Sequence, residues 1–194
     1  YWGKRDNQLP MNPSLSMTLD KAVTQTTIDF RPKASGESLY SFKFHDKPNV
    51  SFSPKLDAFF RHLLAKYPLL GGYYFDIRSQ NSFPHSAGIA SSASAMSALA
   101  LCAEEIAHVV MGQSAFLPID ASELARLGSG SAVRSLHAHW AVWGQTSADS
   151  SASDHVAVPL QKVHPVFKTY CDAILLVDEG EKSVSSSAGH QLMT

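Results

Sequence analysis

The chain has 194 residues, of which 44% are hydrophobic and 17% are charged, so it is long enough to bury the core of one ordinary domain. Sixteen Lys and Arg against seventeen Asp and Glu leave a net charge of -1. This balance excludes a strongly basic nucleic-acid binder and gives no general attraction to an acidic membrane. We therefore expect neither partner, and any bound anion must be captured by a local site.

Cysteine usage and the chain ends bear on the setting of the protein. Cys102 and Cys171 lack the C-x-x-C spacing, which argues against a disulfide framework or a structural zinc site and is typical of a reducing cytoplasm. We find no signal peptide and expect no apolar run long enough to span a bilayer. The sequence begins with Tyr1 rather than Met, and 185–194 has the pattern of a helix opening. We expect both ends to be cuts through a longer protein.

In the first half of the chain, strict alternation of polar and apolar residues predicts a half-buried strand over 14–19. Further strands are expected over 23–30, 38–44 and 73–78. Ser53 as N-cap, followed by Pro54, predicts the start of an amphipathic helix that continues to Tyr67. A second, long helix is predicted over 91–110, with Gly112 as its stop.

In the second half, Asp120 and Glu123 resemble a capping box that opens a short helix through Leu127. A second short helix is expected after the G-S-G-S turn at 128–131. Strands are predicted over 139–143, 155–160 and 170–177, with 146–154 as a hairpin tip. Strands that come in groups between helices, rather than in strict alternation with them, indicate an α+β fold.

The segment 84–93, PHSAGIASSA, is rich in small residues, follows a predicted strand and runs into the long helix. The free N–H groups and the positive dipole end of a helix attract anions, and small side chains let a polyphosphate approach the backbone. The alternative is that small residues here only allow tight helix packing. The spacing by itself does not decide between phosphate binding and packing.

Four blocks of this sequence resemble known motifs. The segment 84–93 is similar to the second motif of the GHMP kinase superfamily, P-x-x-x-G-[LI]-x-S-S-A. Three other blocks resemble signatures of the mevalonate diphosphate decarboxylase family within it: YWGKRD at 1–6 with the P-x-N-x-S-x-S-x-T-L pattern at 10–19, GSGSAVRS at 128–135, and VSSSAG at 184–189 with Gln191. The blocks run from end to end of the chain in the family's order.

The resemblance implies an α+β GHMP kinase-type N-terminal domain, similar to ribosomal protein S5 domain 2, truncated before its C-terminal lobe. Residues 1–183 would form the ATP- and substrate-binding domain without its first strand, and 184–194 would begin the C-terminal domain. The implied reaction is the ATP- and Mg²⁺-dependent decarboxylation of mevalonate 5-diphosphate to isopentenyl diphosphate, in the mevalonate pathway of isoprenoid biosynthesis. The implied assembly is a cytoplasmic homodimer.

The resemblance also implies roles for single residues. Arg134, whose planar fork can bind a carboxylate in two places, would hold the substrate carboxylate, although an ordinary surface ion pair is the alternative. The diphosphate would be contacted from two walls, and Ser186 would contact the mevalonate part. The residues of the two walls are Tyr1 and Lys4 on one side and Ser129, Gly130 and Ser131 on the other. The ATP phosphates would meet Pro84, Gly88, Ala90, Ser91, Ser92 and Ala93, with Mg²⁺ bridging the phosphate oxygens and Ser92 as its one candidate side-chain ligand.

The family's catalytic Asp comes from the C-terminal lobe, and none of Asp6, Asp20, Asp76 or Asp120 matches its motif. We therefore assign no general base and expect this chain alone to be inactive. The H-x-H pair His137 and His139 has no third ligand in the sequence, so it predicts no metal site.

Other functions stay open. A mevalonate 3-kinase or a phosphomevalonate decarboxylase would share these blocks, although Tyr1 and Lys4 together with 128–131 favour the diphosphate substrate. A noncatalytic nucleotide-binding homologue is the alternative from a different class.

Overall fold

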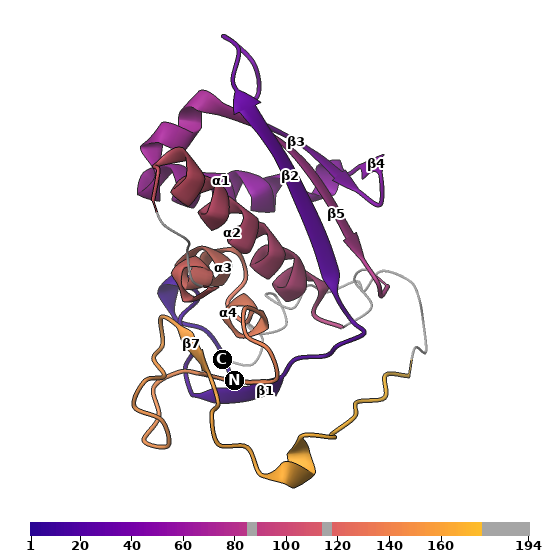
Figure 1. The fold of residues 1–194 in the computed structure, drawn as a ribbon, viewed down its shortest axis with the longest axis vertical. Coiled ribbons are helices and arrows are strands. Elements are labelled where there is room, and N and C mark those ends of the chain that lie inside the picture. The colour runs from indigo at the N-terminus through magenta and orange to yellow at the C-terminus, as the bar shows by residue number, and fades with distance from the viewer. Residues whose placement is uncertain (85–88, 114–117, 176–194) are drawn as a thin grey trace.

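The computed structural model describes residues 1–84, 89–113 and 118–175. Two sheets with helices between them make up the fold (Figure 1). The larger sheet has the strand order β2-β5-β3-β4, and helices α1 (Ser53–Lys66) and α2 (Ser91–Val110) pack on one of its faces. The smaller sheet has the order β1-β6-β7 and lies beyond the short helices α3 (Ser122–Gly128) and α4 (Ala132–Ser135). This arrangement confirms the predicted α+β class.

The larger sheet is built around one long pair of strands. β2 (Thr24–Pro32) runs antiparallel to β5 (Tyr73–Asn81), and β3 (Tyr40–Phe44) pairs in parallel with β5 on its other side. The short strand β4 (Lys47–Pro48) completes the edge. Phe75 and Ile77 alternate with more exposed residues along β5, so one face of the sheet turns into the core.

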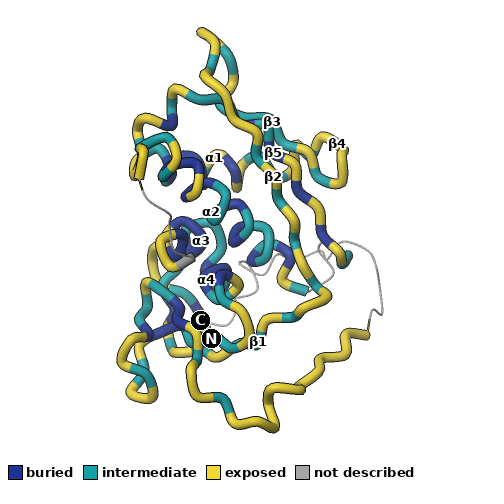
Figure 2. The backbone as a smooth tube through the Cα atoms, viewed as in Figure 1, coloured by how far each residue is buried: buried dark blue, intermediate teal, exposed yellow. Residues whose placement is uncertain are grey.

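The main core lies where α1 and α2 cover this face. The buried residues gather on α1, α2 and α3, which Figure 2 shows in dark blue. They include Leu56, Phe59 and Leu63 of α1 and Met96 and Leu99 of α2, each at most 3% exposed. Their spacing of three and four residues places them on one side of each helix.

Helix α2 corrects one expectation. Among the described helices it alone is long and apolar enough, by length and composition, to cross a membrane, whereas we had expected no such run. Half of that window is buried, and the helix packs against β2, α3 and α4. Its apolar composition is therefore explained by its place in the centre of the fold.

The long helix begins and ends where the sequence predicts, and Gly112 takes the positive φ of 63° that ends it. Two predicted caps are wrong. Ser53 is the first residue of α1 and Phe52 occupies the cap position. Helix α3 (Ser122–Gly128) is preceded by Ala121, because Asp120 lies within the 3-10 turn Pro118–Ala121.

The smaller sheet joins distant parts of the chain. β1 (Ser14–Met17) and β7 (Ala157–Pro159) both pair antiparallel with β6 (Trp140–Trp143), and the predicted hairpin connects β6 to β7. Helix α4 (Ala132–Ser135) follows the G-S-G-S turn as predicted.

The strand predicted over 170–177 is absent from its described part, 170–175, where Tyr170 and Leu175 are 60% and 89% exposed. A strand requires a hydrogen-bonded neighbour, and no described strand pairs with this segment. The remaining short turns are the 3-10 helices Asp6–Gln8, Val50–Phe52, Pro68–Gly72 and Pro165–Phe167.

Candidate functional site

The N-terminal segment lies directly on the G-S-G-S turn. A methyl group at Gly130 would stand 3.1 Å from both the Gln8 carbonyl oxygen and Lys4 Cε, and 3.2 Å from the ring of Trp143. These distances are tighter than ordinary van der Waals contact, and Gly130 is buried. The absence of a side chain at Gly130 therefore lets Lys4 approach the turn, as the predicted two-walled site requires.

Tyr1 joins the two walls. Its ring meets the ring of Trp143 edge-on, with centroids 5.1 Å apart, and its phenol forms a hydrogen bond with Ser131. Trp143, together with Val133 and Ala157, forms a small second core, against which Tyr1 packs. Burial raises the pKa of Tyr1, while the Ser131 bond and the charge of Arg134 act in the opposite direction. Tyr1 therefore presents a protonated hydroxyl at neutral pH.

The guanidinium group of Arg134 has a hydrogen-bond donor that no described residue accepts. One terminal nitrogen donates to Ser14 Oγ at 2.9 Å, and the guanidinium carbon lies 5.7 Å from the Tyr1 ring centre. Its Nε is buried and has no hydrogen-bond partner among the described residues. Burial lowers the pKa of Arg134, because removal from water penalises the charged form. None of the ion pairs within the described residues includes Arg134.

Lys4 is in a similar situation. Its Nζ donates to Gln8 Oε1 at 2.7 Å and lies 5.9 Å from the Tyr1 ring centre. Burial lowers the pKa of Lys4. Lys4 and Arg134 thus both give up hydration while bonding to neutral partners. A bound anion would supply the opposite charge that no ion pair with a described residue provides here.

The start of α2 provides a second anion-binding feature. Ala90 occupies the cap position with a left-handed backbone, φ 54°, and its methyl side chain cannot accept a bond from the first-turn N–H groups. Strained backbone at a helix start is common at ligand sites. Lys55 adds a nearby cation, with its Nζ 3.4 Å from Ser92 Oγ. The dipole, the small residues and this lysine all favour phosphate.

One cleft connects the two features. A cavity of about 340 Å³ is lined on one side by Ala90 and Ala93 at the start of α2, and on the other by Ser131 and Arg134. Ser16 and Met17 of β1, together with the residues that lead from β1 to β2, form its third wall. A ligand with anionic groups at both ends could therefore span from the helix start to the guanidinium.

The structure brings together Tyr1, Lys4, Gly130, Ser131 and Arg134, and Ser129 lies in the same turn, directly after α3. Four of the predicted phosphate contacts lie at the start of α2: Ala90, Ser91, Ser92 and Ala93. Pro84 lies before α2 in the chain, at the end of the described range 1–84. Gly88 and Ser186 lie outside the described residues.

Three residues of the site were not predicted: Gln8, Ser14 and Trp143. Ser14 stands in the N-terminal motif, which gave a signal that it belongs to the site, but nothing in the sequence identified its bond to Arg134. Trp143 lies outside the four family blocks. Its ring contacts the ring of Tyr1 because β6 pairs with β1, which brings these distant segments together.

No group of three or more His, Cys, Asp or Glu residues within 1–84, 89–113 and 118–175 could hold a metal ion. His137 instead forms a hydrogen bond between Nε2 and the carbonyl of Ala157 at 2.8 Å, and burial lowers its pKa. This contact gives His137 a structural role beneath β7.

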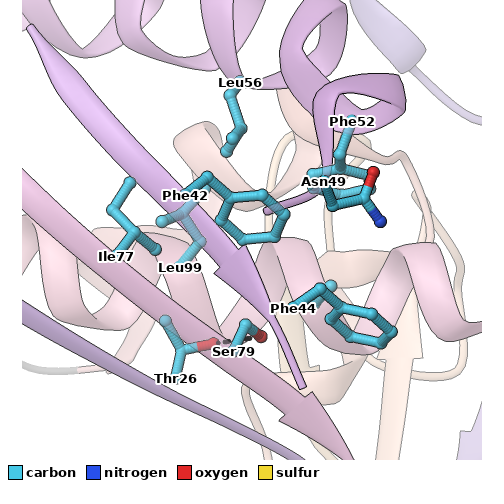
Figure 3. Close-up of a pocket in the computed structure, with 10 residues that line it drawn as sticks. Thr26, Phe42, Phe44, Asn49, Phe52, Leu56, Ile77, Ser79 and Leu99 are labelled. Carbon is cyan, nitrogen blue, oxygen red and sulfur yellow. Dashed lines mark hydrogen bonds between the residues drawn. The ribbon is translucent and has the colours of Figure 1, made fainter. Parts of the chain in front are cut away.

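A separate apolar cavity lies between the larger sheet and the two long helices (Figure 3). Phe42, Phe44 and Phe52 line it, with Asn49 at the rim, and the hydrogen bond between Thr26 and Ser79 closes its lower side at 2.9 Å. Its volume is about 20 Å³, which leaves room for about one water molecule. We assign no ligand to it in this conformation.

Comparison with known proteins agrees with this geometry. A family model described as the diphosphomevalonate decarboxylase-like N-terminal domain matches residues 1–154. A diphosphomevalonate decarboxylase from Ganoderma lucidum is 32% identical over 206 residues, covering 98% of this chain and 49% of that protein.

Solved structures show the same likeness. The crystal structure of mevalonate diphosphate decarboxylase from Staphylococcus aureus superposes with a TM-score of 0.72 at 30% identity, over 98% of this chain and 54% of that one. A structure of MDDEF in complex with MVAPP, AMPPCP and magnesium gives a TM-score of 0.66 at 31% identity, over 98% and 55% of the two chains. The chain spans about half the length of the relatives it matches, and it belongs to the diphosphomevalonate decarboxylase-like family, whose N-terminal domain it carries.

Proposed function

We propose that this chain forms the nucleotide- and substrate-binding part of an enzyme that decarboxylates mevalonate 5-diphosphate in an ATP-dependent reaction. The products would be isopentenyl diphosphate, ADP, phosphate and CO₂. The observation that carries the proposal is the pair Lys4 and Arg134. The described hydrogen-bond partners of both cations are neutral; Lys4 lies against the 128–131 turn, and Arg134 lines the cleft that leads to the start of α2.

The substrate has two anionic ends, a carboxylate and a diphosphate. Arg134 would bind the carboxylate through its Nε, which has no described partner, and a terminal nitrogen, in the two-point geometry that guanidinium groups favour. Lys4, Tyr1 and the turn at Ser129, Gly130 and Ser131 would hold the diphosphate. Fixing both ends orients the tertiary carbon between them and lowers the entropic cost of reaction.

The ATP phosphates fit the start of α2, where Ala90 leaves the first turn without a side-chain cap and Lys55 lies beside Ser92. Pro84, Gly88 and the residues Ala90 to Ala93 would form this cradle. Mg²⁺, which a solved relative holds together with its nucleotide analogue, would neutralise phosphate oxygens here, with the Ser92 hydroxyl as the side chain we propose near it.

The chemistry that the site must support has two stages. The 3-hydroxyl oxygen attacks the terminal phosphorus of ATP and loses its proton, and ADP leaves. The C3–O bond then breaks with loss of phosphate, while the electrons of the bond to the carboxylate form the new double bond and CO₂ leaves. Positive charge that develops at C3 would be favoured beside the bound anionic groups. We assign no general base among residues 1–194. We propose that the group that accepts the proton of the 3-hydroxyl lies outside these residues.

We propose a cytoplasmic protein, because Cys102 and Cys171 are both unpaired. We also propose a homodimer, which sedimentation equilibrium would test directly.

The test uses the protein expressed from its complete gene, supplied with ATP, Mg²⁺ and mevalonate 5-diphosphate, with ADP and CO₂ release followed together. Equal release of the two products supports the proposal. ADP without CO₂ would indicate a 3-kinase, and preference for the monophosphate would indicate a phosphomevalonate decarboxylase. Release of neither product would favour a noncatalytic nucleotide-binding homologue.

A further inference from the structure

Arg126 is a buried cation outside the cleft. It lies on α3, is 3% exposed, and is not among the residues that line the cleft. Its Nε donates to the carbonyl of His155 at 3.3 Å, and one terminal nitrogen donates to the carbonyl of Asn7. Burial lowers the pKa of Arg126, and Glu123 acts weakly in the opposite direction. A buried charge whose described hydrogen-bond partners are main-chain carbonyls needs an explanation beyond packing.

The loop that Arg126 holds has a strained backbone. Asn7 and Gln8 are consecutive non-glycine residues in the left-handed region, with φ values of 57° and 62°. Such backbone persists only where surrounding contacts fix it. Arg5 N–H donates to the Leu9 carbonyl at 2.8 Å, and the Arg5 side chain pairs with Asp154 on the exposed side. Arg126 supplies the buried contact, from beneath the loop.

The same loop carries the partner of Lys4. Gln8 Oε1 accepts the hydrogen bond from Lys4 Nζ at 2.7 Å, and the Gln8 carbonyl lies against Gly130. A continuous chain of contacts therefore leads from Arg126 through Asn7 and Gln8 to Lys4. We propose that Arg126 is a positioning residue that fixes the 5–10 loop, and through Gln8 the ammonium group of Lys4, beside the 128–131 turn where the diphosphate would bind. This inference rests on the proposed function for the identity of the bound anion.

The first test is steady-state kinetics of Arg126→Gln in the protein expressed from its complete gene. The KM for mevalonate 5-diphosphate should rise about tenfold, the scale of one hydrogen bond to a charged group, while the KM for ATP stays within about twofold. Arg126→Lys should not restore the value, because an ammonium cannot reach both carbonyls as a planar fork does. Arg31→Gln, an exposed arginine on β2 paired with Glu37, is the matched control and should leave both constants unchanged.

A double-mutant cycle separates positioning from general stability. If Arg126 acts through Lys4, then Arg126→Gln should add little to the KM of Lys4→Met. Independent, multiplying effects of the two changes would overturn the inference. Should Arg126→Gln fold poorly, Gln8→Leu removes the last link alone, and it should raise the same KM. An unchanged KM in Gln8→Leu would equally overturn it.

Amide hydrogen exchange gives a readout that does not depend on turnover. The N–H groups of Arg5, Leu9 and Met11 all bond within the N-terminal segment, and Arg126→Gln should speed their exchange while α2 stays protected. Unchanged exchange in the segment would contradict the proposed role. If the wild-type protein does not turn over, the proposed function fails by itself. Calorimetric titration with inorganic diphosphate then decides this inference: weaker binding to Arg126→Gln supports it, and equal binding overturns it.

Discussion

The cations around the larger sheet differ from those around the cleft. Among the described residues, three sheet-side cations have carboxylate partners of their own: Arg31 with Glu37, Arg78 with Asp29, and Lys66 with Glu104. Lys4 and Arg134 bond instead to Gln8 and Ser14, which are neutral. A cation paired within the protein contributes to the fold. A cation left beside neutral groups at the proposed site remains available to a ligand, so loss of the two kinds should have opposite consequences.

The largest effect is expected at Arg134. Arg134→Gln should lower kcat/KM by about 1000-fold, or about 4 kcal/mol, the scale reported for removing one transition-state donor. Its melting temperature should not fall, because a desolvated charge without an acidic partner is removed. Arg134→Lys should remain defective, since it lacks the two-point fork. Steady-state rates and thermal melts on the same preparations check both statements, and an active Arg134→Gln enzyme would remove the basis of the comparison.

Loss of Lys66 should lower the stability of the fold and leave substrate binding unchanged, the reverse of the effect expected at Arg134. Glu104 is fully buried and accepts from Lys66 Nζ at 2.7 Å and from the Tyr67 hydroxyl at 2.6 Å. Lys66→Met leaves the carboxylate without its cation, which should cost about 3 kcal/mol of unfolding free energy.

The matched variant Lys66→Met with Glu104→Gln removes the uncompensated charge and should recover part of that loss. Urea denaturation measures the free energy, and substrate KM values should not change. A stable Lys66→Met protein with a raised KM would mean that the two regions are not distinct.

Lys4→Met should produce a smaller, substrate-specific effect. We expect the KM for mevalonate 5-diphosphate to rise about tenfold to thirtyfold, or about 1.5–2 kcal/mol, with the KM for ATP unchanged. Because burial lowers the pKa of Lys4, the wild-type KM should begin to rise at a lower pH than an exposed lysine would give. The pH profile of Lys4→Met should lack this alkaline rise. An identical profile in both proteins would assign the titration to another group.

The smallest effect concerns the exposed pair Arg31 and Glu37. The hydrogen bond from Arg31, helped by the N–H of Ala34, lowers the pKa of Glu37 from its usual 4.5 to about 2. A lowered carboxylate pKa stabilises the fold above pH 4.5, and the contribution disappears as the pH falls toward 2. Solvent screening keeps this contribution small. Arg31→Gln should therefore melt slightly earlier at neutral pH and together with the wild type near pH 2, and a difference that persists at pH 2 would point to lost packing instead.

The sequence predicted the fold class and most of the elements, because local patterns determine them. The helix over 91–110 was correct at both ends, since a long apolar stripe and a C-terminal Gly112 act locally. The capping box at Asp120 was wrong because a 3-10 turn shifted the helix start to Ser122. The prediction of a strand over 170–177 was wrong for its described part, 170–175, because no described strand pairs with this segment. An alternating sequence pattern cannot reveal whether a neighbouring strand is present.

The sequence motifs predicted the main residues of the candidate site, and the structure added the residues that contact them. Arg134, Lys4 and Tyr1 came from the family blocks, and the structure places them together. The bond from Arg134 to Ser14, the contact of Tyr1 with Trp143 and the support from Arg126 depend on segments far apart in the sequence, whereas Gln8, the partner of Lys4, is only four residues from it. No residue spacing carries the long-range contacts, because they arise from the pairing of β1 with β6 and from the packing of α3 against the N-terminal loop.

The most direct test of the account is a calorimetric titration of the protein from its complete gene with mevalonate 5-diphosphate, in the absence of nucleotide. The account predicts saturable binding that both Arg134→Gln and Lys4→Met weaken, while Lys66→Met at a temperature where it stays folded binds as the wild type does. Binding that neither cleft variant weakens would show that these two cations do not form the anion site.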